Sequence, residues 1–258
     1  MITLTTGQIE GWIAAWLWPF LRIGACLMVA PVFGASYVPA RMRLVVAGAI
    51  TLLVAPLLPQ PQVAMFSAAG LIVAVQQLLI GVAIGFVLQI VFDALAMGGQ
   101  LLANTMGLSF AFNVDPLRGT GAPVVGQFYT LVATLTFLAL NGHVAIVQAL
   151  ADGFRTLPIS TDGLDPEGFR QVAQWGTQLF RGALMVALPG VTALLIVNLA
   201  FGVVSRAAPS LNLFAIGFPV TLIAGLLIML AGLPAMQSAF VRLMQDSLRF
   251  AGSLLGAG

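Results

Sequence analysis

The chain has 258 residues, of which 60% are hydrophobic and 7% are charged, and its mean hydropathy is +1.06. Because soluble globular proteins carry about 25% charged residues, this composition excludes an ordinary soluble domain and indicates a membrane protein or a subunit buried in a larger assembly. The net charge of +2, with arginine as the only strongly basic residue type, is too small to indicate nucleic-acid binding, and the single cysteine, Cys26, excludes a disulfide framework.

The first half of the chain contains three long apolar runs. They cover residues 12–33, 44–58 and 68–92. A helix that crosses the hydrocarbon core of a bilayer needs about 20 residues, so the short second run must extend into residues 39–43, tilt, or fail to span. No basic residue lies in Met1–Gly11, so we expect no cleavable signal peptide and interpret the first run as a retained membrane segment.

The second half contains three more apolar runs and an amphipathic segment. The runs cover residues 124–150, 182–203 and 211–233. In Met236–Leu255, the apolar residues Phe240, Met244 and Leu248 share one face at three- to four-residue spacing, which predicts an amphipathic C-terminal helix. The sequence therefore predicts an all-α integral membrane protein with kinked helical hairpins, built as a single membrane domain over residues 1–258.

Asp152–Gln174 is the most polar segment of the chain and is expected to be a water-exposed loop. Within it, Asp165 is predicted to cap the N-terminus of a helix, with Pro166 at the first helical position and Glu167 in the first turn.

The arginines do not determine the membrane topology. With the N-terminus outside, four arginines fall in inside loops and five in outside segments, so the positive-inside rule gives no bias. Polar and proline-broken positions recur in nearly every run, which favours an arrangement other than a conventional bilayer-spanning bundle.

Few residues could carry catalysis or hold a metal. His143 is the only histidine, and it is interpreted as a capping or interface residue, because a proton relay would need an acidic partner and none lies near it in the sequence. One histidine and one cysteine cannot build a zinc or haem site. No phosphate-binding loop, nucleophile elbow or HExxH motif is present. We therefore expect no enzymatic activity, no cofactor and no bound metal.

Two charged residues, one within an apolar run and one directly after another, need partners. Arg22 lies midway along the first run, where a bare charge is costly. Two interpretations remain open for it: a salt bridge or carbonyl contact to a neighbouring subunit, or the lining of a conduit. Asp93 follows the third run and is interpreted as a helix-end residue at an interface.

Small residues and prolines mark further positions of interest. Gly81 and Gly85 form a GxxxG pattern, and such patterns let helix backbones approach closely in an apolar medium, although a chain with 28 glycines produces them by chance. Pro189 and Pro219 each remove a backbone donor and are expected to kink or break their helices. Because transporters place broken helices at substrate sites, these prolines support a rival hypothesis of a small-solute transporter.

Met106–Val124 is too interrupted for a membrane helix and too apolar for an ordinary surface loop. Apolar residues alternate along its first part: Leu108, Phe110 and Phe112. Asp115 and Pro116 then give a turn signal, and Arg118, Gly119 and Gly121 follow it. An exposed apolar strip requires an apolar partner. The residues alone leave two interpretations open: contact with the mouth or lumen of a pore, or a re-entrant loop that packs on its own helices.

Three stretches of the chain resemble the FliR family, the flagellar biosynthesis subunit of the type III export apparatus, which has a counterpart in virulence injectisomes. They are PVFGASYVPARMRLVVAGAITLLVAPLLP (Pro31–Pro59), GLSFAFNVDP (Gly107–Pro116) and SRAAPSLNLFAIGFPVTLIAGL (Ser205–Leu226). The most specific pattern is R-x-A-P-x-L-N-x-F-x-x-G-F-P, formed by Arg206, Ala208, Pro209, Leu211, Asn212, Phe214, Gly217, Phe218 and Pro219. The resemblance covers nearly the whole chain, in order and with similar spacing.

The resemblance implies a non-enzymatic, multi-pass protein of the bacterial inner membrane and the flagellar basal body. One copy would assemble with FliP and FliQ subunits into a helical export gate in contact with lipid, with FlhB around the gate and FlhA beneath it, and unfolded flagellar proteins would pass through its centre. Much of the gate would lie towards the periplasm, which would account for the absent arginine bias. The motif residues, together with Arg22, Arg41 and Arg43, would serve subunit packing.

The resemblance also implies that residues 106–123 form a plug across the closed pore. Leu108, Phe110 and Phe112 would help to seal the lumen, and Gly107, Gly119 and Gly121 would let the loop move aside. Three other interpretations remain: the equivalent subunit of a virulence injectisome, a scaffold that never moves, and the small-solute transporter, which the resemblance disfavours.

Overall fold

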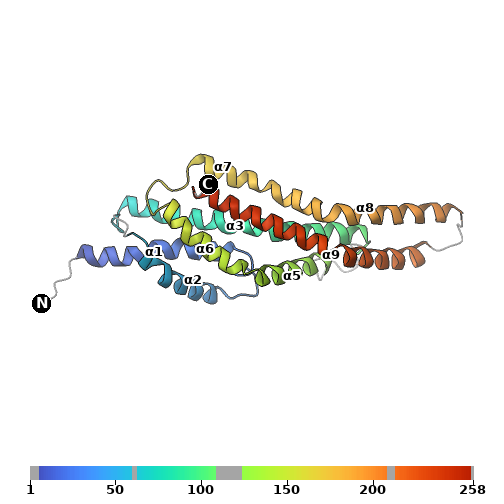
Figure 1. The fold of residues 1–258 in the computed structure, drawn as a ribbon, viewed down its shortest axis with the longest axis horizontal. Helices are drawn as coiled ribbons and strands as arrows, with labels where there is room; N and C mark the ends of the chain where they lie inside the picture. The colour runs from blue at the N-terminus through green and yellow to red at the C-terminus, as the bar shows by residue number, and fades with distance from the viewer. Residues whose placement is uncertain (1–5, 60–62, 109–123, 208–212, 257–258) are drawn as a thin grey trace. The chain divides into compact units, whose positions relative to one another are not determined.

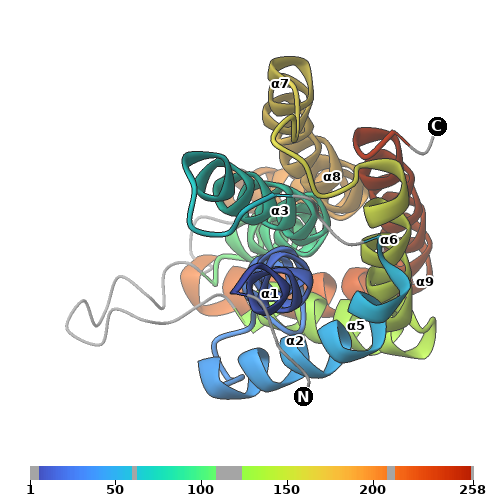
Figure 2. The same cartoon turned by 90° about the vertical axis from the view of Figure 1, so that its left-hand side faces the viewer.

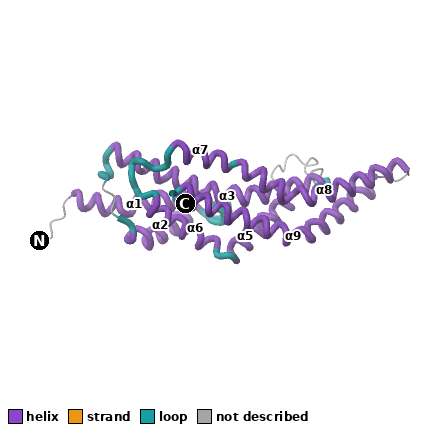
Figure 3. The backbone as a smooth tube through the Cα atoms, turned by 45° about the horizontal axis from the view of Figure 1, so that its top comes forward, coloured by secondary structure: helices purple, strands orange, loops and turns teal. Residues whose placement is uncertain are grey.

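The computed structural model describes residues 6–59, 63–108, 124–207 and 213–256, and all the regular secondary structure in this part of the chain is helical (Figure 3). The elements, in order, are α1 (Thr6–Val29), α2 (Ala40–Val54), the short 3-10 helix η1 (Ala55–Leu57), α3 (Ala68–Thr105), α5 (Val124–Ala139), α6 (Gly142–Thr156), α7 (Pro166–Trp175), α8 (Thr177–Ala207) and α9 (Leu213–Leu254) (Figure 1). Five helical segments are long and apolar enough to cross a membrane, or six if α5 and α6 count as one span. The prediction of an all-α integral membrane protein is therefore confirmed.

The helix boundaries differ from the predicted runs at several places. The second run does extend towards the N-terminus, because α2 begins at Ala40 and, with η1, gives an 18-residue apolar segment ending at Leu57. The fourth run is two helices rather than one. Asn141 separates α5 from α6 with a φ of 56°, a left-handed conformation that a helix interior does not tolerate and that Asn adopts more readily than most residues.

The sixth run and the amphipathic C-terminal segment are a single helix, α9, which continues through Pro219 and Pro234. Likewise Pro189 lies inside α8 without ending it. A proline removes only one backbone donor, and an apolar medium favours keeping every other backbone group hydrogen-bonded within the helix. The segment expected to be a polar loop is also largely helical, since α6 continues to Thr156 and α7 begins at Pro166.

The chain forms two compact units that interleave along the sequence. The first comprises residues 1–90, 140–176 and 245–258, and the second comprises residues 91–139 and 177–244. Two helices, α3 and α9, continue from one unit into the other, so neither unit is a separate stretch of sequence. The single domain expected over residues 1–258 stays a prediction.

In the first unit, α1 lies among α2, α6 and the first part of α3, as the end-on view of α1 in Figure 2 shows. Trp18 is buried with Ala14 and Val73, and Ile159, from the segment between α6 and α7, packs against them. The end of α9 belongs to this unit. Phe250 stacks on Trp175 with ring centroids 4.1 Å apart and an interplanar angle of 7°, so the C-terminal turns of α9 are fixed against α7.

In the second unit, an aromatic cluster joins three helices. Phe92 of α3 makes edge-to-face contacts with Phe137 of α5 and Phe240 of α9, at centroid distances of 5.7 and 5.4 Å, in the geometry that aromatic quadrupoles favour. Asp93 lies exposed within α3, which continues to Thr105, so its interpretation as a helix-end residue is wrong. Asp93 interrupts the apolar run, but helix formation depends on backbone pairing and tolerates one exposed carboxylate, so α3 continues beyond it.

Candidate functional site

Arg22 makes several hydrogen bonds across the described part of the first unit. Its Nε donates to Oε1 of Gln77 in α3 at 2.7 Å. Its Nη1 donates to the carbonyl oxygens of Gly153 and Leu157 at 3.2 and 3.0 Å, and Nη2 donates to Leu157 O at 3.0 Å. The guanidinium carbon also lies 4.2 Å from the centre of the Phe154 ring, a cation–π distance. These contacts connect α1, α3 and the end of α6.

These contacts decide between the two interpretations of Arg22. Its partners are carbonyl groups, as one interpretation held, but they belong to the same chain rather than to a neighbouring subunit. The side chain is completely buried, so within the described structure it does not line a water-filled conduit. Its charge lies at the C-terminus of α6, where the helix dipole is negative and free carbonyls accept hydrogen bonds. Arg22 therefore caps α6.

The Gly81–Gly85 pattern is the place where α3 meets α1. A Cβ added to Gly81 would collide with the carbonyl oxygen of Arg22 and lie 2.9 Å from Ala25 Cβ, and a Cβ added to Gly85 would lie 2.7 Å from the carbonyl oxygen of Cys26. The pattern, weak as a sequence signal, marks a real backbone contact of the type seen between membrane helices.

Arg43 holds the turn between α1 and α2, whereas Arg41 is exposed. The Arg43 guanidinium donates to the carbonyl oxygen of Ala35 at 2.7 Å. Gly34 permits the tight return of the chain, because a Cβ there would lie 2.8 Å from the carbonyl oxygens of both Met28 and Ala30. Arg43 thus has a role within the chain, and Arg41 is available to a partner.

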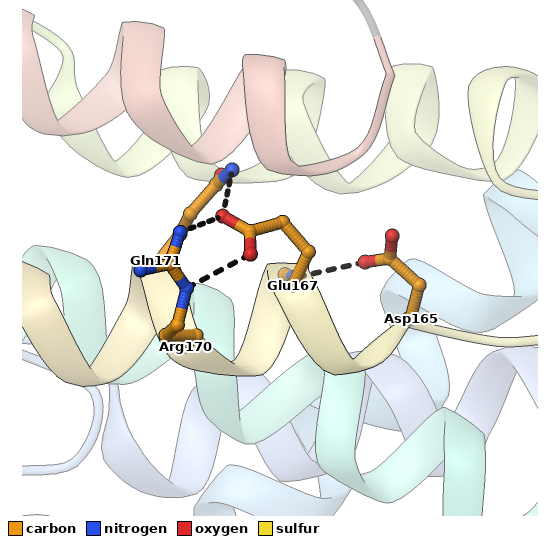
Figure 4. Close-up of polar contacts among 5 residues, drawn as sticks. Asp165, Glu167, Arg170 and Gln171 are labelled. Carbon is orange, nitrogen blue, oxygen red and sulfur yellow. Dashed lines mark hydrogen bonds and ion pairs between the residues drawn. The ribbon is translucent and has the colours of Figure 1, made fainter.

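The first turn of α7 is built as the sequence predicted. The Asp165 side chain accepts a hydrogen bond from Gly168 N at 2.7 Å, Pro166 begins the helix and Glu167 lies in its first turn (Figure 4). Glu167 also accepts two hydrogen bonds from the Arg170 guanidinium, at 2.8 and 2.7 Å, and one from Gln171 (Figure 4). All these side chains are solvent-exposed or partly so. The polar groups at the start of α7 therefore form hydrogen bonds with one another.

A pocket of about 650 Å³ lies in the second unit, where α3 ends beside α8 and α9. We call it the α3–α8–α9 pocket. It is lined by Asn104, Thr105, Met106, Gly107, Leu195, Asn198, Phe201, Gly217, Phe218 and Thr221. The pocket brings together one glycine of the predicted plug segment and two residues of the predicted family motif, which are about 110 positions apart in the sequence.

Gly107 ends α3 in a specific cap. Its φ is +82°, the Gly107 N–H donates to Asn104 O, and the Leu108 N–H donates to Ala103 O, both at 3.1 Å. This pair of bonds is a Schellman motif, which requires a left-handed residue and so favours glycine. Met106 is buried next to Gly225 of α9, where an added Cβ would collide with the Met106 side chain. The end of α3 is therefore held in place by both a hydrogen-bonded cap and side-chain packing.

The remaining predicted residues divide into two groups. The first group lies outside the described residues: Phe110, Phe112, Asp115, Pro116, Gly119, Gly121, Pro209 and Asn212. Phe214 lies in α9, but its side chain is outside the described part; Arg206 is exposed in the last turn of α8, and Phe218 and Pro219 are exposed near the start of α9.

Sequence reasoning missed part of the pocket lining. Asn198 is a polar residue within the apolar run 182–203, but Asn104, Thr105 and Thr221 give no separate signal in the sequence, because only the fold places them around one space. Among the described residues, no group of three or more His, Cys, Asp or Glu side chains could hold a metal ion.

Known proteins related to this chain are bacterial export proteins. The family described as "Bacterial export proteins, family 1" matches residues 13–247. Flagellar biosynthetic protein FliR of Escherichia coli (strain K12) is 41% identical over 234 residues, which are 91% of this chain and 90% of that protein. FliR of Pectobacterium carotovorum subsp. carotovorum is 40% identical over 88% of this chain and 87% of that protein, and FliR of Aquifex aeolicus (strain VF5) is 32% identical over 92% of each. The chain therefore belongs to the FliR family of bacterial export proteins.

Proposed function

We propose that the chain is a core subunit of the flagellar protein export gate in the bacterial inner membrane. The observation that carries this proposal is the family relationship across residues 13–247, with relatives that are named flagellar biosynthetic proteins. That relationship and the five apolar helical segments support a multi-pass membrane subunit of the flagellar export apparatus. The flagellar names of the relatives favour this system over a virulence injectisome.

The exposed apolar surface of α8 and α9 supports assembly with other membrane subunits. In the most apolar stretch of the α7–α8 segment only 17% of the residues are buried, and in that of α9 only 11% are buried. The corresponding share is 50% in both α1 and α3. Large apolar side chains protrude from both helices: Leu188, Ile196, Leu199, Val203, Ile223, Leu226, Leu227 and Leu230. Such a surface requires lipid or protein cover. We assign the cover to FliP and FliQ subunits around one copy of this chain, with FlhB and FlhA as further partners.

The segment after the α3 cap is proposed to help close the pore. Met106 and Gly107 give it a fixed, well-packed origin, so that only the residues beyond need to change position between two states. Apolar constrictions can block water and ions by dewetting, and the phenylalanines at 110 and 112 supply apolar surface. An arriving unfolded chain would compete for that surface and displace the segment, which requires two states separated by only a few kcal/mol.

Native mass spectrometry of the gently solubilised chain, co-expressed with its FliP and FliQ neighbours, tests the assembly. A heteromeric particle with a single copy of this chain is expected. A lone monomer or homodimer that binds a small solute would contradict the proposal and restore the transporter hypothesis.

Ion leakage tests the closing role. Replacing residues 109–121 by a short Gly-Ser linker leaves the Gly107–Leu108 cap of α3 in place. We expect the gate to assemble and the membrane to become permeable to ions. Unchanged permeability with normal assembly would refute the closing role, and reduced assembly without leakage would show that the segment is only a scaffold.

A further inference from the structure

The α3–α8–α9 pocket has a lining that is both apolar and polar. Met106, Leu195, Phe201 and Phe218 provide apolar surface, and Asn104, Thr105, Asn198 and Thr221 provide polar groups. Its volume of about 650 Å³ lies within the range of ligand-binding pockets. Asn104 and Asn198 are both exposed, so each can present its carboxamide to a molecule in the pocket.

The polar groups narrow the class of occupant. Thr105 and Thr221 donate their hydroxyl protons to helix carbonyls, of Leu102 at 2.7 Å and of Phe218 at 3.0 Å, so towards the pocket their oxygens remain acceptors. Each asparagine offers a donor and an acceptor. A lipid acyl chain would leave these groups facing hydrocarbon, which is costly. A small polar solute would leave the apolar majority of the lining without contacts.

We propose that this pocket binds an unfolded polypeptide in an extended conformation. The backbone of such a chain carries one donor and one acceptor per residue that are not yet paired, and a carboxamide matches both. Its side chains project alternately to the two sides, so apolar ones can contact Phe201 and Phe218 while the backbone pairs with Asn104 and Asn198. Because backbone groups are the same in every protein, such a site accepts many different sequences.

Gly217 keeps the pocket open. A Cβ added at this position meets nothing within 4 Å, so a larger side chain there would extend into the pocket without disturbing the helices.

This inference rests on the proposed export function and adds to it the place where a transported chain contacts the subunit.

Site-specific photocrosslinking in cells is the direct test. Benzoylphenylalanine replaces Phe218, which is 40% exposed and lines the pocket, and in a matched control it replaces Phe180 of α8, which is 58% exposed and does not line it. The cells produce an export substrate fused to a tightly folded domain that halts it during transport. We expect a covalent adduct between this chain and the halted substrate from position 218 and none from position 180.

The other outcomes have distinct meanings. An adduct from position 218 to another gate subunit or within this chain, or no adduct while the substrate is demonstrably halted, would overturn the pocket proposal and leave the export function intact. If cells lacking this chain still export flagellar proteins, the proposed function itself fails, and this control is measured first.

Replacement of the carboxamides provides the second test. Asn104→Leu and Asn198→Leu keep the volume of the lining and remove its hydrogen-bonding groups, and Gln237→Leu removes an exposed amide of α9 that does not line the pocket. One net hydrogen bond corresponds to a factor of about five, so we expect each pocket variant to lower substrate crosslinking about fivefold and the control variant to leave it unchanged. Unchanged crosslinking in both pocket variants would exclude backbone pairing by these asparagines, and the proposal with it.

Discussion

Replacing Arg22 by methionine should destabilise the first unit severely, because the guanidinium satisfies groups that nothing else can reach. Methionine keeps a similar length and apolar stem but has no donor. Gly153 O would still accept from the Leu157 N–H at 3.0 Å. Leu157 O and Gln77 Oε1 would lose the only hydrogen bonds described for them, in a site where Arg22 is completely buried.

The magnitude follows from these two acceptors. A buried acceptor left without a partner costs about 1–3 kcal/mol, and loss of the contact with the Phe154 ring costs roughly 0.5–2 kcal/mol. Removing the buried charge returns part of its desolvation cost, so we expect a net loss of about 3–5 kcal/mol, which is the range for breaking a buried charged interaction. That is a large part of the roughly 5–15 kcal/mol that stabilises a typical domain.

A double variant distinguishes this reasoning from a simple packing defect. In Arg22→Met the Gln77 carboxamide is buried with neither end bonded, since its Nε2 already has no partner in the described structure. Adding Gln77→Leu removes that unsatisfied group. The double variant should therefore be more stable than the sum of the two single losses predicts, by about 1–2 kcal/mol.

The assay is denaturant unfolding of the purified chain in detergent micelles, with the free energy of unfolding compared across the set. Arg41→Met is the matched control, because Arg41 is exposed and its replacement should change stability by less than about 0.5 kcal/mol. Wild-type stability of Arg22→Met would refute the capping role of Arg22, and strict additivity of the two substitutions would refute the energetic coupling between Arg22 and Gln77.

Four further predictions use the same unfolding assay or hydrogen exchange. Gly81→Ala should cost about 1–3 kcal/mol by forcing α3 away from α1, whereas Gly48→Ala, which meets no neighbour in α2, should stabilise by about 0.5–1 kcal/mol; equal effects would contradict the backbone contact. Gly107→Ala should cost about 1 kcal/mol and speed amide exchange in the last turn of α3, because alanine disfavours the φ of +82°, and an unchanged exchange rate would count against the cap. Asp165→Ala should cost about 1 kcal/mol, with faster exchange at Gly168 N, and Glu167→Gln should leave that amide protected. Phe92→Ala should cost about 3–5 kcal/mol through the cavity left between Phe137 and Phe240, while Leu199→Ala, which is 73% exposed, should leave the chain stable and lower only the yield of the assembled gate.

Local sequence signals predicted well wherever the structure depends on neighbours along the chain. Asp165, Pro166 and Glu167 form the predicted helix start, because a cap is made within four residues. The amphipathic pattern of the last segment is also confirmed, with Phe240 and Met244 buried and Arg242 and Asp246 exposed. Boundaries that depend on packing were harder to predict: the predicted apolar run ends before Asp93, but α3 continues for three more turns, and the next run continues through Asn141, where the helix breaks.

The sequence by itself determined the class of the protein, because composition and helix-length apolar runs depend only on the cost of exposing polar backbone to an apolar medium, and it determined the family through the motifs and their spacing. Only the tertiary structure decided which groups meet. Arg22 and Leu157 are 135 positions apart, and Asn104, Asn198 and Thr221 lie on three helices around one pocket. Such contacts are made by side chains that share no periodicity or spacing, so their partners become known only when the helices are packed together.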